Sequence, residues 1–434
     1  MNKKVALHNL GCKVNAYEVE AMQQLLEAKG YEIVPFEPGA DIYIINTCTV
    51  TNIADRKSRQ MLHKAKKMNP QAIVVATGCY VQAAKEQLEV DPAIDLVIGN
   101  NQKQRLVSIL ENYDSNHGNQ ESVIDINKTH EYEELEIEKT AEHTRAYIKV
   151  QDGCNQFCTY CIIPFARGRV RSRKLDDVVK EVSRLAESGY QEVVLTGIHL
   201  SSYGTDFTEQ PESLLSLIQA VHSVPGVKRI RLGSLEPRII TEEFARTIAS
   251  LEKVCPHFHL SLQSGCDATL ERMNRRYSAA EYKEKCQLLR KVYNNPALTT
   301  DVIVGFPGET QEEFEESREF VDDIAFFETH IFKYSRRNGT KAAVMENQVP
   351  DEVKTSRSHE MIAIGKRHEQ EYIKQFLGQE LEILVEEQLQ IDGENYWVGH
   401  TREYVKAAVK SSENLENHIV KLCPTKMFSE GILY

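Results

Sequence analysis

The feature that most restricts the fold is an alternation of short β-rich runs with amphipathic helical stretches along most of the 434 residues. This alternation is typical of parallel sheets whose strands are joined by crossover helices. Over residues 1–112, KVALHNL, DIYIINT and AIVVATG predict strands, and NAYEVEAMQQLLEAKG and ADRKSRQMLHKAKKMN predict helices. We therefore expect an N-terminal α/β domain built on a parallel sheet.

A second alternating series occupies residues 144–370. Its predicted strands are AYIKVQ, VVLTG, RIRLGS, HFHLSLQ, TTDVIVGF and THIFKYS, and helical patterns such as DDVVKEVSRLAESG separate them. Six β/α units form either an open sheet or a partial barrel, and in both the loops after the strands carry the chemistry.

Two other regions complete the predicted organisation. Residues 113–143 are polar and acidic, as in EYEELEIEK, and predict a linker, parts of which could pair as edge strands. A long polar helix from about residue 351 leads into residues 371–434, where short strands and turns predict a small antiparallel β-barrel.

Composition limits the class of protein. With 27% charged and 41% hydrophobic residues, the chain has the composition of a soluble globular protein. No apolar run approaches the roughly 18 residues of a transmembrane helix, and MNKKVALHNLGC resembles a first strand more than a signal peptide. We expect a cytoplasmic protein with no membrane partner. The net charge of −12 disfavours indiscriminate nucleic-acid binding but permits a local basic surface.

Ten cysteines are too few for a disulfide scaffold in a chain of this length, so metal binding or redox chemistry is their better use. GCNQFCTYC places Cys154, Cys158 and Cys161 directly after a predicted strand, with no fourth ligand nearby. A four-iron cluster held this way keeps one iron open, whereas zinc would need a distant fourth ligand. Zinc sites favour C-x2-C pairs, so the spacing favours a cluster and leaves zinc as the alternative.

Three more cysteines occupy equivalent positions in the N-terminal region. HNLGC, IINTC and VATGC place Cys12, Cys48 and Cys79 just beyond three predicted parallel strands. Because the carboxyl ends of neighbouring parallel strands converge on one edge, these thiols predict a second three-ligand cluster. The alternative is three small buried residues, since free cysteine is commonly buried. The remaining cysteines show no such regularity and are expected to be structural: Cys255, Cys266, Cys286 and Cys423.

The C-x3-C-x2-C loop, with Tyr160 before its third cysteine, resembles that of the radical S-adenosylmethionine (SAM) enzymes. The resemblance implies that SAM binds the open iron and is cleaved by one electron to methionine and a 5′-deoxyadenosyl radical. The motifs LTGIH, GSLEP, SLQSG and DVIVGFPGE follow later strands, where the superfamily contacts SAM, although a glycine after a strand is more often only a turn. The SAM-binding residues implied by the resemblance are Tyr160, Gly197, Glu236, Gln263, Val304 and Gly305.

Two clusters together resemble one family, the methylthiotransferases. The resemblance implies an N-terminal methylthiotransferase domain with an auxiliary 4Fe–4S cluster (1–112), a radical SAM domain (144–370) and a C-terminal TRAM domain (371–434), joined by the acidic segment 113–143. LGCKVNAYEVEA, DGCNQFCTYCIIPFARGRVRSR and HLSLQSGCDATLERMNRRY look most like the branch that modifies N6-threonylcarbamoyladenosine at position 37 of tRNA. The alternatives within the family are isopentenyladenosine in tRNA and a ribosomal-protein side chain.

The implied reaction replaces the C2–H of the adenine with a methylthio group. One SAM would serve as methyl donor and a second as radical source, while the protein supplies position and electrostatics. The implied partners are tRNA, through its anticodon stem-loop, an electron donor protein and a sulfur source. The non-catalytic alternative is an iron–sulfur or zinc protein that binds RNA or senses redox state.

A basic tract follows the second cysteine loop. FARGRVRSRK has five cationic residues and no acid, and Arg167, Arg169, Arg171 and Arg173 alternate, so an extended segment would present them on one side. Guanidinium groups suit phosphates, so we predict that these arginines and Lys174 contact tRNA. The alternative is a solvated loop paired with local carboxylates.

The C-terminal region is less basic than RNA binding would suggest. Residues 371–434 contain six Lys and Arg against eleven Asp and Glu. RNA contacts there would therefore depend on a few residues such as Arg402, or on aromatic stacking.

Overall fold

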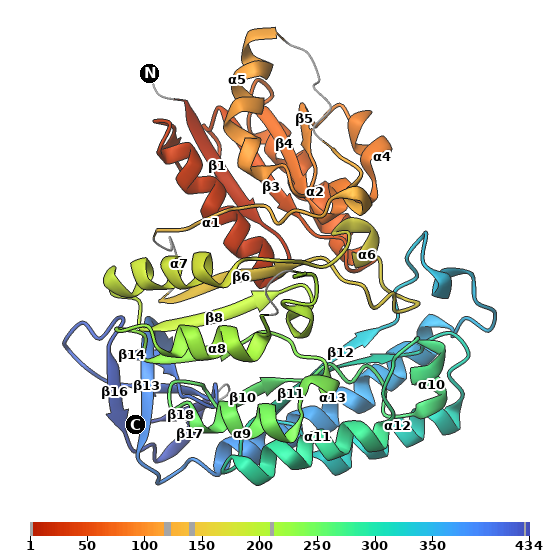
Figure 1. Cartoon of the computed structure of the whole chain (residues 1–434), viewed down its shortest axis with the longest axis vertical. Helices are drawn as coiled ribbons and strands as arrows, with labels where there is room; N and C mark the ends of the chain where they lie inside the picture. Colours follow the sequence, from red (N-terminus) through yellow and green to blue (C-terminus); the bar gives the residue numbers. More distant parts are fainter. Residues whose placement is uncertain (1–2, 117–122, 139–143, 209–211, 429–430) are drawn as a thin grey trace.

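The computed structural model describes residues 3–116, 123–138, 144–208, 212–428 and 431–434. The N-terminal domain lies on one side of a larger parallel barrel, and the C-terminal sheet packs against another part of that barrel (Figure 1). Among the helices of the described residues, none is both long enough and apolar enough to cross a membrane.

The N-terminal sheet is parallel, with the strand order β2-β1-β3-β4-β5. Its strands are β1 (Lys4–Asn9), β2 (Glu32–Ile33), β3 (Ile42–Thr47), β4 (Ile73–Gly78) and β5 (Leu96–Ile98). Its helices are α1 (Lys13–Glu27), α2 (Asn52–Met68), α3 (Cys79–Ala83), α4 (Lys85–Glu89) and α5 (Leu106–Asn116). α1 and α5 cover one face and α2 the other, so every residue of β3 is buried.

The second domain is the partial barrel, one of the two architectures left open by the sequence. Its parallel strands are β6 (Arg145–Asp152), β8 (Glu192–Gly197), β9 (Arg229–Leu232), β10 (His257–His259), β11 (Ala297–Val304) and β12 (Glu328–Lys333). Isolated parallel bridges such as Leu235–Leu260 join β9 to β10, and the short β7 (Arg171–Ser172) runs antiparallel beside β6.

Helices surround this barrel and cover its outer face. They are α6 (Ile163–Ala166), α7 (Leu175–Glu187), α8 (Leu214–His222), α9 (Glu242–Ser250), α10 (Asp267–Arg272), α11 (Ala279–Val292), α12 (Gln311–Ile324) and α13 (Asp351–Lys374). α7, α8, α9, α11 and α12 bury their apolar sides against the strands in one continuous core. The strand residues that point away from these helices, towards the inner face of the barrel, include polar ones such as His259, Asp301 and His330.

The C-terminal sheet has the strand order β16-β13-β14-β15-β18-β17. Its strands are β13 (Leu381–Ile391), β14 (Glu394–His400), β15 (Lys406–Val409), β16 (Ile419–Leu422), β17 (Lys426–Phe428) and β18 (Gly431–Leu433). The pairs are antiparallel, as predicted, except that β15 and β18 run parallel. Trp397 and Ile432 share a core with Phe327 and Tyr372, so this sheet packs directly on the barrel and α13.

The central part of the predicted acidic linker is packed against both domains. Leu135 and Ile137 are buried in the barrel core between exposed glutamates, and no residue of 123–138 pairs as a strand. The Tyr17 hydroxyl of α1 donates to the Leu135 carbonyl, and the Ile137 N–H donates to Glu181 of α7 at 2.6 Å. Residues 123–138, named here the strap, therefore hold the two domains together (Figure 1). Residues 117–122 and 139–143 of the predicted linker lie outside the described residues.

Candidate metal centres

The first cysteine triad lies at the carboxyl edge of the N-terminal sheet. Cys12 precedes α1, Cys48 follows β3, and Cys79 begins α3 immediately after β4. A methyl group added at Gly11 would lie 3.1 Å from the Cys48 sulfur, so the first two loops are in contact. The Cys48 thiol interacts electrostatically with both Cys79 and Cys12. The fold thus brings together three thiols that are far apart in the sequence.

The second triad lies on one loop after β6. The Gln156 N–H donates to the Cys154 sulfur at 3.5 Å, and the Cys161 N–H donates to the Cys158 carbonyl at 3.0 Å. Gly153 begins the loop with a φ of +70°, and a Cβ there would lie 1.8 Å from the Arg169 carbonyl oxygen. Only glycine fits this position, because both the backbone conformation and the space exclude a side chain.

A zinc ion and a four-iron cluster require different spacings of three thiols. Three sulfurs about 2.3 Å from one zinc lie less than 4 Å from one another. Among the described residues, the one group of three potential ligand atoms that all lie within 4.8 Å of each other is His259, Asp301 and His330. Neither cysteine triad forms such a group, so the choice between a cluster and zinc rests on the ligand pattern, which favours a four-iron cluster.

Burial makes these thiols poor ligands until a metal displaces their protons. It raises the pKa of Cys154 to about 11 and, together with the neighbouring Cys158, that of Cys161 to about 12. Each triad also receives one guanidinium hydrogen bond, from Arg167 to the Cys79 sulfur at 3.0 Å and from Arg275 to the Cys158 sulfur at 3.3 Å. Such donors stabilise the negative charge of thiolates bound to iron, so both triads fit a 4Fe–4S cluster.

The prediction that alternating arginines present their charge to tRNA is wrong for Arg167, Arg171 and Arg173, which are fully buried. Arg167 reaches the N-terminal domain, where it donates to Asn15 at 2.6 Å and pairs with Glu18. Arg171 pairs with Asp152, and Arg173 with Glu181. The alternation places these side chains on the side of the segment that faces the protein interior. There they pair with acids of α1, β6 and α7.

Glu18 is the centre of this buried charge network. It lies on α1 and pairs with Arg167 and Lys149 of the barrel and with Lys103 of its own domain, the two lysines at 2.9 and 3.2 Å. Burial alone would raise its pKa, but these three cations hold the pKa of Glu18 well below its usual range. Glu18 lies on the same face of α1 as the apolar residues Val14, Tyr17 and Ala21. This position within an apolar helix face is the sequence signal from which the burial of Glu18 could have been predicted.

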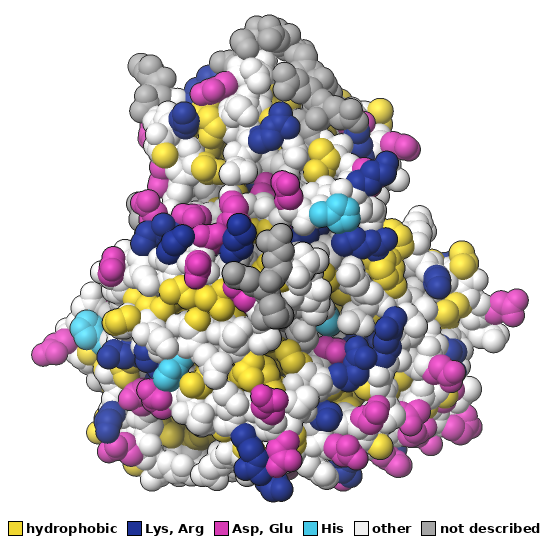
Figure 2. All heavy atoms as spheres, viewed as in Figure 1, with side chains coloured by type: hydrophobic (Ala, Val, Ile, Leu, Met, Phe, Trp, Pro, Cys, Tyr) yellow, Lys and Arg dark blue, Asp and Glu magenta, His cyan; other side chains and the backbone are white. Residues whose placement is uncertain are grey.

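The other residues predicted to bind RNA differ in accessibility. Lys174 is exposed, and Arg169 is half-buried with its guanidinium 4.5 Å above the Phe157 ring. Arg402 donates to the Val254 carbonyl at 3.0 Å and so ties the C-terminal sheet to the barrel. Figure 2 shows basic side chains interspersed with acidic ones on one face, with basic groups at the boundary between the N-terminal domain and the barrel.

Several residues predicted to bind SAM surround the second triad. Tyr160 packs against Phe306 with ring centroids 6.4 Å apart. Gly197, at the end of β8, lies so close to Gln151 that a Cβ would approach its amide oxygen to 2.8 Å. Glu236 is buried and interacts electrostatically with Cys154. These residues thus line the carboxyl edge of the barrel beside the cysteine loop.

The remaining predicted SAM contacts have structural partners of their own. Gln263 has a φ of +71° and its N–H donates to the Asp301 carbonyl at 2.8 Å. The Val304 side chain is in the apolar core, so only its main chain can face the barrel mouth. The Gly305 N–H donates to Glu309 at 2.6 Å. Their SAM contacts stay predictions.

The sequence did not single out two residues that lie near the second triad, Arg275 and His199. Arg275 lies in the NRRY segment, donates to the Cys158 sulfur and stacks 4.9 Å over the Tyr277 ring. His199 ends the LTGIH motif, and burial lowers its pKa to about 4. Its Nδ1 lies 2.6 Å from the Ser202 hydroxyl, while its buried Nε2 has no protein partner.

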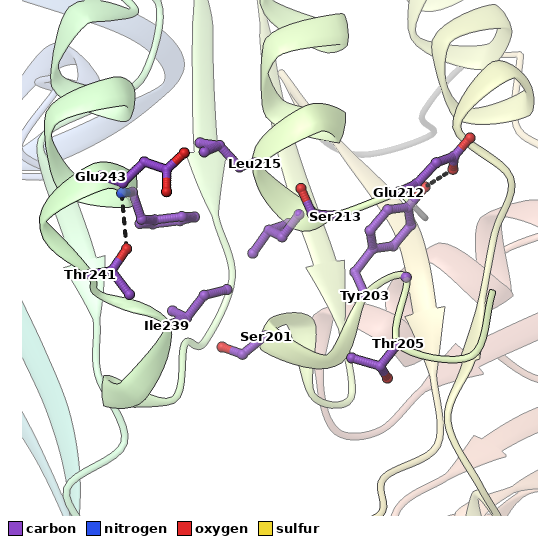
Figure 3. A pocket seen from close by; sticks show the side chains of 12 residues that line it. Ser201, Tyr203, Thr205, Glu212, Ser213, Leu215, Ile239, Thr241 and Glu243 are labelled. Atoms are coloured by element: carbon purple, nitrogen blue, oxygen red, sulfur yellow. Dashed lines mark hydrogen bonds between the residues drawn. The ribbon is translucent and has the colours of Figure 1, made fainter. Parts of the chain in front are cut away.

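One cavity of about 460 Å³ lies apart from both triads, between the starts of α8 and α9 (Figure 3). Ser201, Tyr203, Glu212, Thr241 and Glu243 are among its lining residues. It contains no cysteine, and its two carboxylates make it unsuited to phosphate. Ser201 connects it to the barrel edge, because its hydroxyl accepts the Glu236 N–H at 2.8 Å.

Comparisons with known proteins agree with this arrangement. Residues 4–99 match the uncharacterized protein family UPF0004, and residues 148–321 match the radical SAM superfamily. The threonylcarbamoyladenosine tRNA methylthiotransferase MtaB of Bacillus subtilis (strain 168) is 42% identical over 99% of this chain and 95% of its own length. A tRNA-2-methylthio-N(6)-dimethylallyladenosine synthase of Carboxydothermus hydrogenoformans is 35% identical over 98% of this chain and 97% of its own.

The fold also has relatives among solved structures. The radical S-adenosylmethionine methyltransferase TsrM from Kitasatospora setae, with cobalamin and a [4Fe-4S] cluster bound, superposes with a TM-score of 0.59. The match covers 79% of this chain and 77% of that one at 16% identity, so it is a likeness of fold alone.

Proposed function

Because this chain belongs to the radical SAM tRNA methylthiotransferases, we propose that it converts N6-threonylcarbamoyladenosine at position 37 of tRNA to its 2-methylthio derivative. The observation that carries the proposal is the pair of cysteine triads at strand ends of two domains, with Arg167, which follows the second cysteine loop, donating to Cys79 of the first triad. A reaction that brings a methylthio group and a carbon radical to one base needs this proximity. The similarity to the threonylcarbamoyladenosine enzyme exceeds that to the dimethylallyladenosine enzyme over the same length, which favours the former substrate.

Each cysteine triad is assigned one cluster. Cys12, Cys48 and Cys79 would hold the auxiliary 4Fe–4S cluster, and Cys154, Cys158 and Cys161 the radical SAM cluster. When bound, the clusters and SAM supply the sulfur, the methyl group and the radical. Arg167 and Arg275 donate hydrogen bonds to one cysteine sulfur of each triad. We propose that Glu236, which interacts electrostatically with Cys154, and His199, which interacts with Glu236, help to orient SAM.

The reaction also implies partners. We propose that tRNA enters through its anticodon stem-loop, with exposed Lys174 among the phosphate contacts. An electron donor protein and a sulfur source are required by the chemistry. Because the substrate is tRNA and both clusters need reduced thiols, we propose that the enzyme works in the cytoplasm.

The test is mass spectrometry of tRNA nucleosides from a strain lacking this gene. We expect loss of 2-methylthio-N6-threonylcarbamoyladenosine with the other nucleosides unchanged, and restoration by the wild-type gene. Cys48→Ala and Cys158→Ala genes should not restore it, whereas Cys423→Ala, outside both triads, should. Loss of the methylthio derivative of isopentenyladenosine instead would overturn the choice of substrate.

A further inference from the structure

The inner face of the barrel carries a group of polar side chains that the cysteine triads do not use. The lumen group, as named here, consists of Lys13, His259, Asp301, Glu328 and His330. Lys13 comes from the N-terminal domain, directly after the cluster residue Cys12, and the other four come from β10, β11 and β12.

Strand register places the four barrel residues on one face. Asp301 pairs with His330 across β11 and β12, and Thr299 pairs with both His259 and Glu328. Their sequence neighbours Phe258, Leu298 and Val302 point the other way, into the core under the helices. The lumen group is partly accessible to solvent, with His330 49% exposed. Further along the same face of β12, the Phe332 ring is 44% exposed and offers a surface for a base to stack on.

Neighbouring residues connect the lumen group to both triads. At one end Lys13 adjoins Cys12. At the other, the Ser261 carbonyl, two residues along the strand from His259, accepts hydrogen bonds from Arg275 at 3.4 Å and Tyr277 at 2.6 Å. Arg275 also contacts the Cys158 sulfur. The lumen group therefore adjoins residues of both cysteine sites.

Lys13 is the uncommitted cation of this region. Its ammonium interacts electrostatically with Arg145, Arg231, Glu192 and Glu328, yet forms no ion pair with any residue that the structure describes. The two arginines are engaged elsewhere. Arg145 pairs with Glu386 at 3.4 Å, and Arg231 pairs with Glu192 at 2.6 Å.

The histidine and aspartate side chains of the lumen group already have partners inside the protein, which disfavours a metal ion. Two histidines and one aspartate within 4.8 Å could ligate a cation. However, Asp301 already lies 3.3 Å from the His259 Nε2, and the His259 Nδ1 lies 3.0 Å from the Thr299 hydroxyl. Lys13 interacts electrostatically with His330 and Glu328 and is the cation of the lumen group with which a substrate carboxylate can pair.

We propose that the lumen group recognises the threonylcarbamoyl substituent of the substrate base, with Lys13 pairing with its carboxylate. His259, Asp301 and His330 provide donors and acceptors for the threonyl hydroxyl and the carbamoyl group. This inference rests on the proposed function and adds the residues that select the substrate. An isopentenyl group has no polar atom to offer, so it would leave Lys13 and its neighbours desolvated and unpaired, and a site of this kind rejects such an analogue strongly.

The test uses the enzyme with both clusters loaded and anticodon stem-loops bearing three modifications at position 37. These are threonylcarbamoyladenosine, its carboxyl methyl ester and isopentenyladenosine. For wild type we expect kcat/KM to fall about 10- to 100-fold on esterification, as for one charged hydrogen bond. Lys13→Met should lower kcat/KM for the acid by the same factor and respond little to esterification. Lys29→Met, at the exposed far end of α1, is the matched control and should behave as wild type.

Iron content and cluster absorbance are measured for each variant, because Lys13 adjoins a cluster ligand. If Lys13→Met does not keep both clusters, the acid-to-ester ratio is measured with Lys13→Arg, expected to keep the preference, and His330→Gln, expected to reduce it. An unchanged acid-to-ester ratio in Lys13→Met, or in His330→Gln where that variant replaces it, would overturn the inference and leave the proposed function standing. Wild-type activity on the isopentenyl stem-loop but not the threonylcarbamoyl one would overturn both.

Discussion

At the scale of single residues, buried charge and strained backbone mark the positions on which the site depends. Arg167 and Glu18 are fully buried, yet each has its charge matched across the domain boundary. His199 is the opposite case, because burial keeps it neutral. Gly153 has neither charge nor side chain, and its importance is conformational.

His199 makes stability depend on pH. Its pKa is lowered from 6.5 to about 4 by burial, so between these values the unfolded state binds more protons than the folded state. Its contribution is complete above pH 6.5 and is lost as the pH falls towards 4. We expect wild type to lose about 2 kcal/mol of unfolding free energy from this group between pH 7.5 and pH 5.

The measurement compares urea unfolding of wild type and His199→Gln at these two pH values. Glutamine does not titrate, so the free-energy difference between the two proteins should shrink by that amount at pH 5. A difference that stays constant with pH would show that His199 titrates normally.

Gly153→Ala is expected to prevent formation of the second cysteine loop. The new Cβ would meet a main-chain oxygen that cannot move without opening the loop, and the φ of +70° is itself unfavourable. We expect loss of about half the iron after reconstitution, because one of two clusters is lost. Gly189→Ala is the matched control, since Gly189 also has a positive φ but nothing within 4 Å of an added Cβ. Full iron content in Gly153→Ala would contradict the expectation.

At the scale of elements, a cysteine after each strand and a short glycine-bearing loop were predictable, because strand periodicity and turn chemistry are local. HNLGC, IINTC and VATGC each end a strand as expected, and the six β/α units form the partial barrel, one of the two architectures that their number allowed. The strap was not predictable as a packed element. Its glutamates dominate the composition, while the two apolar residues that decide its position, Leu135 and Ile137, are only a small part of the pattern.

Leu135→Ala tests the strap as an element. Removing a buried leucine side chain is expected to lower the free energy of unfolding by about 2–5 kcal/mol. Urea unfolding of wild type and Leu135→Ala at neutral pH measures this difference in the free energy of unfolding. Glu131→Ala, at an exposed position of the same segment, should change it by less than about 0.5 kcal/mol. Equal effects of the two substitutions would indicate that the strap is only a connection.

At the scale of the whole molecule, the two domains are held in one arrangement by buried ion pairs, the strap and contacts after β12. Arg337 donates to Thr49 at 2.7 Å and pairs with Asp55 at 2.7 Å, close to Cys48. These contacts bring the carboxyl edge of one sheet opposite that of the other. The tertiary structure therefore creates a site that neither domain has alone.

Glu18→Gln tests this arrangement. It leaves Arg167, Lys103 and Lys149 buried with less negative charge among them, and breaking a buried pair typically costs about 3–5 kcal/mol. We expect a lower thermal midpoint and a shifted reduction potential of the auxiliary cluster, because Arg167 loses the partner that fixes it against Cys79. Glu32→Gln, on the exposed residue of edge strand β2, should change neither. A wild-type midpoint and potential in Glu18→Gln would show that Asp152 alone fixes Arg167.

The sequence by itself determined which residues end the strands, and hence where both sets of thiols lie along the chain, because hydrophobic periodicity and loop spacing are properties of neighbouring residues. Only the tertiary structure decided where the charges point. Arg167 and Glu18 are 149 residues apart in the sequence, and no local pattern shows that they form a buried ion pair. The same holds for Lys13 and His330, whose approach depends on how one domain rests on the other. Local regularity predicts elements, whereas long-range electrostatics becomes visible only once those elements are packed.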